Sequence, residues 1–259
     1  MAAAPALTGG EVLSREEFAA SLRALSARYW DKHPFHVRLH AGDCGPVEVR
    51  SWVANRWYYQ RILSQKNAAI MANCPLPEVR RRWRDRLTFH DGHSDTDIAM
   101  GHSDKLHGSG LVDWLVLAEA VGLTRDEVID ERHVLVGVRF AVDAYLAFCR
   151  TRPWLEGVAA ALTELFSPDL MSDRIVAWRR HYGWIRPDGF AYFETRIPVV
   201  QRDSDDTLNL VLDSCRTRAE QEAAVAALAF KCDVLNAMLD AIDYACLRDR
   251  GFGTASPAR

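Results

Sequence analysis

The most informative segment for the fold is VEVRSWVANRWYYQRIL, residues 47–63. Its large apolar side chains at Val49, Trp52, Val53, Trp57 and Leu63 recur three and four positions apart, which predicts one stripe of an amphipathic helix. Gly45-Pro46 stands just before it, and proline favours the first turn of a helix. We therefore expect a helix that begins at this dipeptide and runs past Gln60.

Two polar pairs share the register in which this chain otherwise places its core. Arg56 and Gln60 lie in the stripe just described, and Tyr192 and Arg196 have the same four-residue spacing further along. A buried Arg or Gln costs several kcal/mol unless a partner is supplied. Either the stripe has a partly exposed edge with the arginine stem reaching water, or an anionic ligand supplies the partner.

The rest of the chain is helical in pattern almost throughout. Ser14-x-x-Glu17 predicts a capping box that opens a helix to about Trp30, and Thr124-x-x-Glu127 predicts a second. Thr217-x-x-Glu220 should begin a long last helix that reaches about Asp249. Phe190–Phe193 is the best short strand candidate. These patterns predict an all-α single-domain bundle over residues 13–249, with disordered tails at 1–12 and 250–259.

Composition excludes several classes of protein. A net charge of −3 in 259 residues argues against a broad nucleic-acid surface. Six scattered cysteines without a CxxC motif argue against a disulfide scaffold and suit a reducing compartment. We find neither a signal peptide nor a run of apolar residues long enough for a membrane span. The expectation is a soluble cytoplasmic protein.

Further polar residues are candidates for chemistry. Lys231 falls among the buried positions of the last helix, between Leu228 and Leu235. Arg139 and Asp143 are spaced to neutralise each other inside an apolar helix. His90 ends a basic helix, where it is either a cap or a proton carrier. Cations that could converge on a small polyanion are Arg56, Lys66, Arg196 and Lys231.

Histidines gather in two other segments. His33, His36 and His40 follow the first helix and predict a structural corner that could line a pocket. Residues 93–110 form a long polar loop that carries three histidines. Together with His90 these suggest a metal site, but no pair has the HxxxH or HExxH spacing that fixes two ligands on a helix. We therefore favour no metal site there.

Several blocks of sequence, in order, resemble the PqqC family of pyrroloquinoline quinone (PQQ) synthases. They are WVANRWYYQ (52–60), KNAAIMANCP (66–75), HDG (90–92), ERHVLVGVRFAVDAYLAF (131–148), LTELFSP (162–168) and FK (230–231). The resemblance covers roughly residues 14–249.

The resemblance implies a heme-oxygenase-like all-helical fold and a homodimer. It also implies the last step of PQQ biosynthesis, in which a bicyclic precursor with several carboxylates undergoes ring closure and stepwise oxidation. Molecular oxygen would be the co-substrate, hydrogen peroxide would be released, and no metal or organic cofactor would be needed, since the substrate itself is redox-active.

The resemblance also implies site residues, which match its motifs one by one. Arg56, Gln60 and Lys66 match substrate-holding positions, and His90 matches the active-site proton carrier. Tyr192 and Arg196 match a helix that closes over bound product. Lys231 matches a pocket lysine, and Tyr145 falls in a matching block that lines the site.

Three features depart from the family pattern. Trp30 and Met171 stand where pocket histidines are expected, and the loop at 93–110 is about ten residues longer. Both substitutions replace a polar group with apolar bulk. They leave open a related substrate, or a protein that binds PQQ or its precursor without catalysis. A metal-dependent oxidase of the same superfamily would need an HxxxDxxH-like run on a late helix, and no histidine follows His181.

Overall fold

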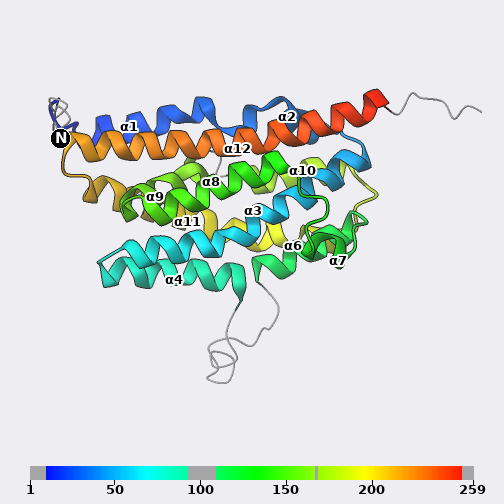
Figure 1. Cartoon of the computed structure of the whole chain (residues 1–259), viewed down its shortest axis with the longest axis horizontal. Coiled ribbons are helices and arrows are strands. Elements are labelled where there is room, and N and C mark those ends of the chain that lie inside the picture. Colours follow the sequence, from blue (N-terminus) through cyan, green and yellow to red (C-terminus); the bar gives the residue numbers. More distant parts are fainter. Residues whose placement is uncertain (1–9, 93–108, 167–168, 253–259) are drawn as a thin grey trace, which may run out of the picture.

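The computed structural model describes residues 10–92, 109–166 and 169–252, apart from the side chains of residues 164, 198–203 and 249–252. All regular structure in these ranges is helical, so the all-α prediction is confirmed (Figure 1). The predicted disordered tails and the histidines at 93, 102 and 107 lie largely or wholly outside the described residues. The α-helices are α1 (Arg15–Ala24), α2 (Pro34–Ala41), α3 (Pro46–Asn73), α4 (Pro77–Asp91), α6 (Gly110–Ala120), α7 (Arg125–Ile129), α8 (Val136–Thr151), α9 (Trp154–Ala160), α10 (Leu170–His181), α11 (Ala191–Ser214) and α12 (Arg218–Phe252).

Helices α3 and α12 organise the packing. Helix α3 contacts α4, α6, α8, α9 and α12, and α12 contacts α8, α9 and α1. In Figure 1 the first and last helices therefore run side by side, with α8 and α3 beneath them and α4 furthest away. The residues that α3 turns toward its neighbours are consequently surrounded by several helices from distant parts of the chain.

Local signals set the starts of three helices. Ser14 and Glu17 form the expected capping box at α1, and Thr124 and Glu127 form that of α7. At the start of α12, the Thr217 amide donates to Glu220 and the Glu220 amide donates to the Thr217 hydroxyl. These reciprocal bonds satisfy amides that the helix itself leaves without acceptors.

Two predictions about secondary structure are wrong. Helix α1 ends at Ala24 rather than near Trp30, and two 3-10 turns, Leu25–Arg28 and Trp30–Lys32, follow it. Residues Phe190–Phe193 form no strand, because a 3-10 turn ends at Phe190 and α11 begins at Ala191. Four residues are too few to separate alternation from helical periodicity, and packing against α6 and α10 decides in favour of the helix.

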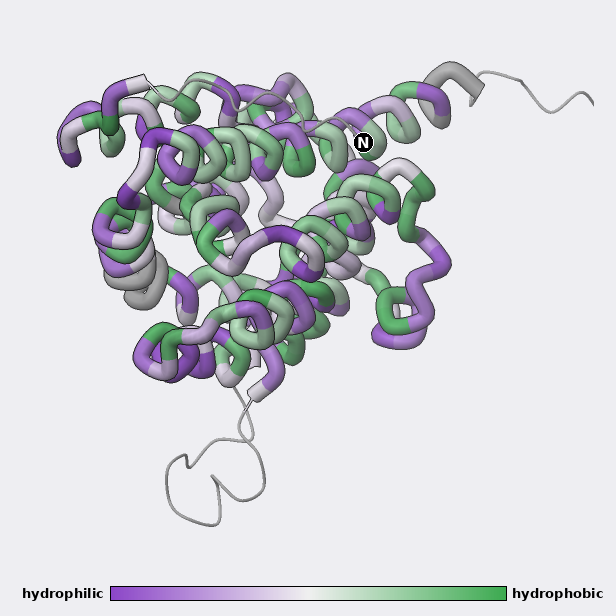
Figure 2. The backbone as a smooth tube through the Cα atoms, turned by 60° about the vertical axis from the view of Figure 1, so that its left-hand side comes forward, coloured by the Kyte–Doolittle hydropathy of each residue, from purple (hydrophilic) through white to green (hydrophobic). Residues whose placement is uncertain are grey.

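Hydrophobic and hydrophilic residues alternate along the helices, as Figure 2 shows. None of the helices in the described ranges has the length and apolarity to cross a bilayer. The centre of the core is aromatic, with Trp52 packed edge to face against Trp178 and also in contact with Trp114. This aromatic core lies immediately beside the polar residues described next.

Candidate functional site

Together with Tyr145, Lys231 is one of the two most deeply buried predicted site residues. It lies on α12 with 1% of its surface exposed, and its Nζ donates a hydrogen bond to Tyr59 Oη at 2.6 Å. The same nitrogen lies 3.6 Å from the ring centroid of Tyr145 on α8 and 4.1 Å from that of Tyr59 on α3. Two nearly parallel tyrosine rings therefore surround a lysine that could not snorkel to water.

Arg56 continues this arrangement along α3. Its guanidinium carbon lies 4.0 Å from the Tyr59 ring centroid and 4.4 Å from that of Trp30. The Nη1 atom is buried and has no hydrogen-bond partner in the part of the chain that the structure describes. Aromatic faces attract the positive charge but accept no conventional hydrogen bond, so the Nη1 donor gains no acceptor from these rings.

Arg174 on α10 extends the set on the other side of Trp30. Its guanidinium carbon lies 5.8 Å from the Trp30 centroid, 4.9 Å from Trp52 and 5.5 Å from Phe193. Only 1% of the residue is exposed, and among the described residues neither Nε nor Nη2 has a partner. Together these residues form a cation–aromatic array in which the order is Tyr145, Lys231, Tyr59, Arg56, Trp30 and Arg174.

The charge of Arg56 destabilises the charged forms of the other two cations of the array. Burial and then the charge of Arg56 lower the pKa of Arg174 to about 9. Burial, followed by the charges of Arg56 and Lys66, lowers the pKa of Lys231 well below its usual value. Across the described ranges, no Asp or Glu forms an ion pair with Arg56, Arg174 or Lys231. Such a cluster is stabilised when an anion enters it.

The two polar pairs recognised in the sequence meet in space. Tyr192 on α11 donates from its hydroxyl to Gln60 Oε1 on α3 at 3.0 Å, and both residues are buried. The ring of Tyr192 also packs edge to face against Trp114. Gln60 keeps its amide NH₂ as a donor beside Arg56, one turn away on the same helix.

His90 lies at the far end of the same region, one residue before the C-terminus of α4. Burial and the charges of Arg196 and Lys66 lower its pKa well below 6.5, so the imidazole is neutral near pH 7. Its Nδ1 is buried without a partner among the described residues. The interpretation of His90 as a charged helix cap is therefore disfavoured, and a neutral imidazole suits a proton acceptor.

The remaining predicted residues surround these groups. Lys66 is buried on α3 and lies near enough to lower the pKa values of both His90 and Lys231. Arg196 is partly buried on α11, with its guanidinium carbon 4.9 Å from the Phe89 ring centroid. The structure thus brings every predicted site residue into one connected region between α3, α4, α8, α11 and α12.

Sequence reasoning missed two members of this region, Arg174 and Tyr59, and did not foresee the contacts of a third, Trp30. Arg174 falls in the register of Leu170 and Trp178, both of which are buried, so the test that found Arg56 could have found it. Tyr59 lies between two predicted residues and was not singled out. Trp30 was expected to replace a polar group with apolar bulk, yet its indole contacts two guanidinium groups. Met171 is partly buried against the core one turn before Arg174.

The histidines predicted to form a structural corner lie beside the array. His33 caps α2 by accepting from the Phe35 amide at 3.1 Å. The rings of His36 and His40 stack with centroids 4.2 Å apart, and His36 lies 5.5 Å from Trp30. Burial, followed by the charge of Arg174, lowers the pKa of His36 to about 2 and that of His40 to about 3.

Within the described ranges, no group of three or more His, Cys, Asp or Glu side chains is placed to hold a metal ion. The three loop histidines considered for such a site lie outside those ranges.

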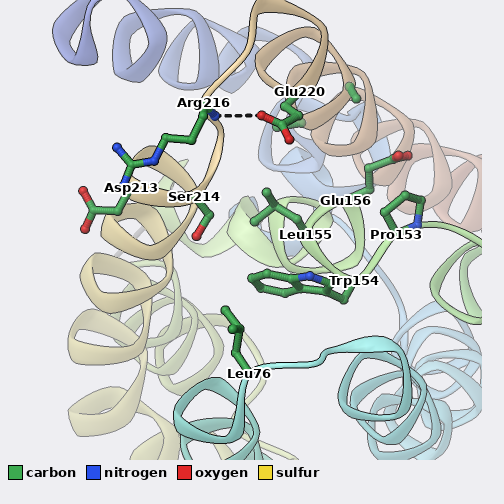
Figure 3. Close-up of a pocket in the computed structure, with 11 residues that line it drawn as sticks. Leu76, Pro153, Trp154, Leu155, Glu156, Asp213, Ser214, Arg216 and Glu220 are labelled. Carbon is green, nitrogen blue, oxygen red and sulfur yellow. Dashed lines mark hydrogen bonds between the residues drawn. The ribbon is translucent and has the colours of Figure 1, made fainter.

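A separate pocket of about 520 Å³ opens at one end of the bundle (Figure 3). It lies between the turn after α3, the start of α9 and the α11–α12 connection, and Figure 3 shows the Trp154 ring between Leu76 and Leu155. Its charged groups at Asp213, Arg216 and Glu220 are exposed, and no predicted site residue lines it. The buried cations and the neutral histidine lie elsewhere, so we place the candidate site at the array.

Curated relatives match nearly the whole chain. Proteins named pyrroloquinoline-quinone synthase are 43% identical in Cronobacter sakazakii, over 94% of this chain and 93% of the relative, and 45% identical in Rhizobium rhizogenes, over 91% of each. A protein of the same name in Ruegeria pomeroyi is 46% identical over 89% of this chain and 91% of its own length.

Solved structures share the fold at low sequence identity. A domain of unknown function with a heme oxygenase-like fold from Shewanella denitrificans aligns with a TM-score of 0.68 at 11% identity, over 96% of this chain and 99% of that one. A TenA homologue from P. horikoshii aligns with a TM-score of 0.64 at 13% identity, over 87% and 97%. The predicted heme-oxygenase-like architecture is confirmed. The TENA/THI-4/PQQC family model matches residues 19–241, and the chain belongs to that family.

Proposed function

We propose that this chain is a pyrroloquinoline-quinone synthase. Its substrate would be the bicyclic, polycarboxylate precursor of PQQ, on which it would close the second nitrogen ring and carry out an oxygen-dependent oxidation. The relatives named above motivate the reaction. The observation in this chain that supports it best is a buried set of cations that contact aromatic rings and have no carboxylate partner among the described residues.

The first role of the array would be to bind carboxylates. Arg56 and Arg174 have buried N–H groups without acceptors among the described residues, and a substrate carboxylate would supply acceptors for each. Each charge-assisted bond would also relieve the repulsion between the cations. The aromatic rings of Tyr59 and Trp30 would keep these side chains in place before the ligand arrives.

The second role would be proton transfer. His90 is neutral in the free protein and could accept a proton from a substrate carbon or nitrogen. Lys231 and Tyr59 share a 2.6 Å hydrogen bond and could pass a second proton. A bound polyanion would raise the pKa values of His90 and Lys231, so substrate binding itself would favour the protonated forms.

Electrons would leave the substrate for molecular oxygen, with hydrogen peroxide as a product. Because the partly oxidised precursor is a quinol-like, electron-rich compound, we propose no metal and no organic cofactor. Burial of Lys231, Tyr192 and Gln60 would keep bulk water from the reacting intermediates. The homodimer and the cytoplasmic location implied by the family resemblance are part of this proposal.

The test is an absorbance assay of metal-free protein with the PQQ precursor, started anaerobically and then opened to oxygen. We expect no PQQ spectrum before oxygen is admitted, then appearance of PQQ with oxygen uptake and peroxide release. Elemental analysis of the same sample would check that no iron or manganese is present in stoichiometric amount.

Two results would change the proposal. Protein that neither turns over the precursor nor binds PQQ would overturn it. Protein that binds PQQ without consuming oxygen would be a carrier, the alternative that Trp30 and Met171 first suggested. In that case His90→Asn would leave its behaviour unchanged, whereas it should stop turnover of a synthase.

A further inference from the structure

Trp30 links the two arginines of the array. Among the described residues, its indole is the one ring within cation–π distance of both guanidinium groups, at 4.4 Å from Arg56 and 5.8 Å from Arg174. The other rings are not shared: Tyr59 contacts Arg56, while Trp52 and Phe193 contact Arg174. Helices α3 and α10 each supply one guanidinium, and the Trp30 indole contacts both of these groups.

Trp30 is itself firmly held. Only 2% of it is exposed, and it packs against the rings of Tyr29, at 6.1 Å, and His36, at 5.5 Å. The 3-10 turn that carries it is followed by Pro34, at the first position of α2, which fixes the local backbone. An indole with only two side-chain torsions, packed on several sides, has little freedom to move.

We propose that Trp30 is a positioning residue that holds Arg56 and Arg174 in a fixed relation and thereby makes the site selective for ligands with at least two carboxylates. The inference rests on the proposed function in one respect, that the natural ligand is a polycarboxylate. One carboxylate would meet Arg56 Nη1, and a second would meet Arg174 Nε and Nη2, the atoms that have no partner among the described residues. A ligand with a single carboxylate could occupy either arginine and would gain nothing from their relation.

The experiment compares ligands that differ only in the number of carboxylates. Benzene-1,3,5-tricarboxylate, benzene-1,3-dicarboxylate and benzoate are titrated into the full-length chain and into Trp30→Leu. We expect the variant to lose about tenfold or more in affinity for the first two probes, the size of a desolvated cation–π contact, with benzoate affected far less. Trp30→Phe retains a ring and should show a smaller loss.

Two controls separate positioning from general damage. Trp57→Leu removes another buried tryptophan, next to Arg56 in the chain but outside the array, and should lower the thermal midpoint without changing the selectivity among the probes. Adding Trp30→Leu to Arg174→Met should cost little further tricarboxylate affinity, since Trp30 would act through Arg174. Independent, additive losses would overturn the inference.

The remaining outcomes also decide the matter. Equal losses for all three probes would show that Trp30 is only structural. A wild-type chain that binds the tricarboxylate no better than benzoate would overturn the selectivity itself. If the probes behave as expected but the PQQ precursor is not oxidised, the proposed function fails while the role of Trp30 stands.

Discussion

Two neighbouring tyrosines on α3 lie in opposite chemical surroundings. Tyr58 has Arg61 and Arg139 over its ring, at 5.0 and 4.8 Å, and both arginines form 2.7 Å ion pairs with Glu131. Its hydroxyl donates to Asp143 at 2.6 Å. Each of the cations over Tyr58 thus forms an ion pair with a carboxylate of the protein itself, that of Glu131.

Tyr59 also lies against two cations, and these differ from the arginines over Tyr58 in their partners. Arg56 and Lys231 lie 4.0 and 4.1 Å from its ring, and Lys231 donates to its hydroxyl. Within the described ranges neither cation forms an ion pair with an acid. A cation–ring contact alone therefore does not identify an anion-binding site. Cations that have rings but no carboxylates are those left available to an anionic ligand.

The largest effect should come from replacing His90, the neutral histidine of the candidate site. His90→Asn removes the proton acceptor, and we expect the rate of precursor oxidation to fall by about 10²- to 10⁴-fold while PQQ still binds. Steady-state oxygen uptake and a PQQ titration measure the two quantities.

His133→Asn is the matched control, because His133 is exposed and lies beside the carboxylate of Glu127 rather than beside buried cations. Its turnover should equal that of the wild type. A similar loss in both variants, or full activity in His90→Asn, would contradict the role assigned to His90.

The next effect concerns the arginines over the two tyrosines. Arg56→Met removes a cation without an acidic partner, and we expect PQQ affinity to fall by ~2–5 kcal/mol while the free energy of unfolding stays equal or rises. Arg139→Met removes a cation paired with Glu131 and should leave PQQ affinity unchanged. Its stability should change by at most about 1 kcal/mol, since this pair is partly exposed.

Calorimetric titration measures the PQQ affinity of both variants, and chemical denaturation measures their stability. Equal losses of PQQ affinity in the two variants, or unfolding of Arg56→Met, would contradict the different roles assigned to these arginines.

A third prediction concerns pH. The folded pKa values of His36, about 2, His40, about 3, and His90, well below 6.5, lie under the ordinary histidine value. Between those values and pH 6.5 the unfolded chain therefore binds more protons, and the free energy of unfolding should decrease as pH falls below 6.5. The slope is at most about 1.4 kcal/mol per pH unit for each histidine.

Denaturation curves at pH 7, 6 and 5 measure this slope. His36→Gln should flatten it, and bound PQQ should flatten it further by raising the histidine pKa values. A stability that is constant from pH 7 to 5 would contradict the burial of these neutral rings.

The smallest effect concerns the two hydroxyls. Tyr58→Phe leaves Asp143 without its 2.6 Å donor, and we expect a loss of about 1–2 kcal/mol in stability with normal turnover. Tyr59→Phe removes the acceptor of Lys231 and should alter turnover or its pH profile instead. If the two substitutions changed stability and turnover equally, the different roles of Tyr58 and Tyr59 would be refuted.

Much of the site could be predicted from register alone. Arg56, Gln60 and Lys231 were singled out because helical periodicity places them among core residues, and the structure buries Gln60 and Lys231 and encloses the Arg56 guanidinium. Arg174 shows the same periodicity, because Leu170 and Trp178, four residues before and after it, are both buried. The capping boxes at Ser14, Thr124 and Thr217 likewise depend on contacts within a few residues.

The choice of partners could not be predicted in this way. The i,i+4 spacing of Arg139 and Asp143 predicted mutual neutralisation, which is wrong, because Arg139 pairs with Glu131 and Asp143 accepts from Tyr58. Helical spacing states which side chains share a face. It does not state which other helix covers that face, or what that helix carries.

Residue patterns alone thus predict an all-helical chain, the starts of α1, α3, α7 and α12, and the presence of polar groups in core positions. Helix packing, in contrast, places Tyr58 beside Glu131 and Asp143, and Tyr59 beside cations that have no acidic partner among the described residues. It also places Trp30 against both Arg56 and Arg174. The difference arises from the sequence separation of the residues in contact. Periodicity and capping follow from neighbours along one helix, whereas the array is assembled from residues on α3, α8, α10, α12 and the turn before α2, whose contacts depend on how the helices pack.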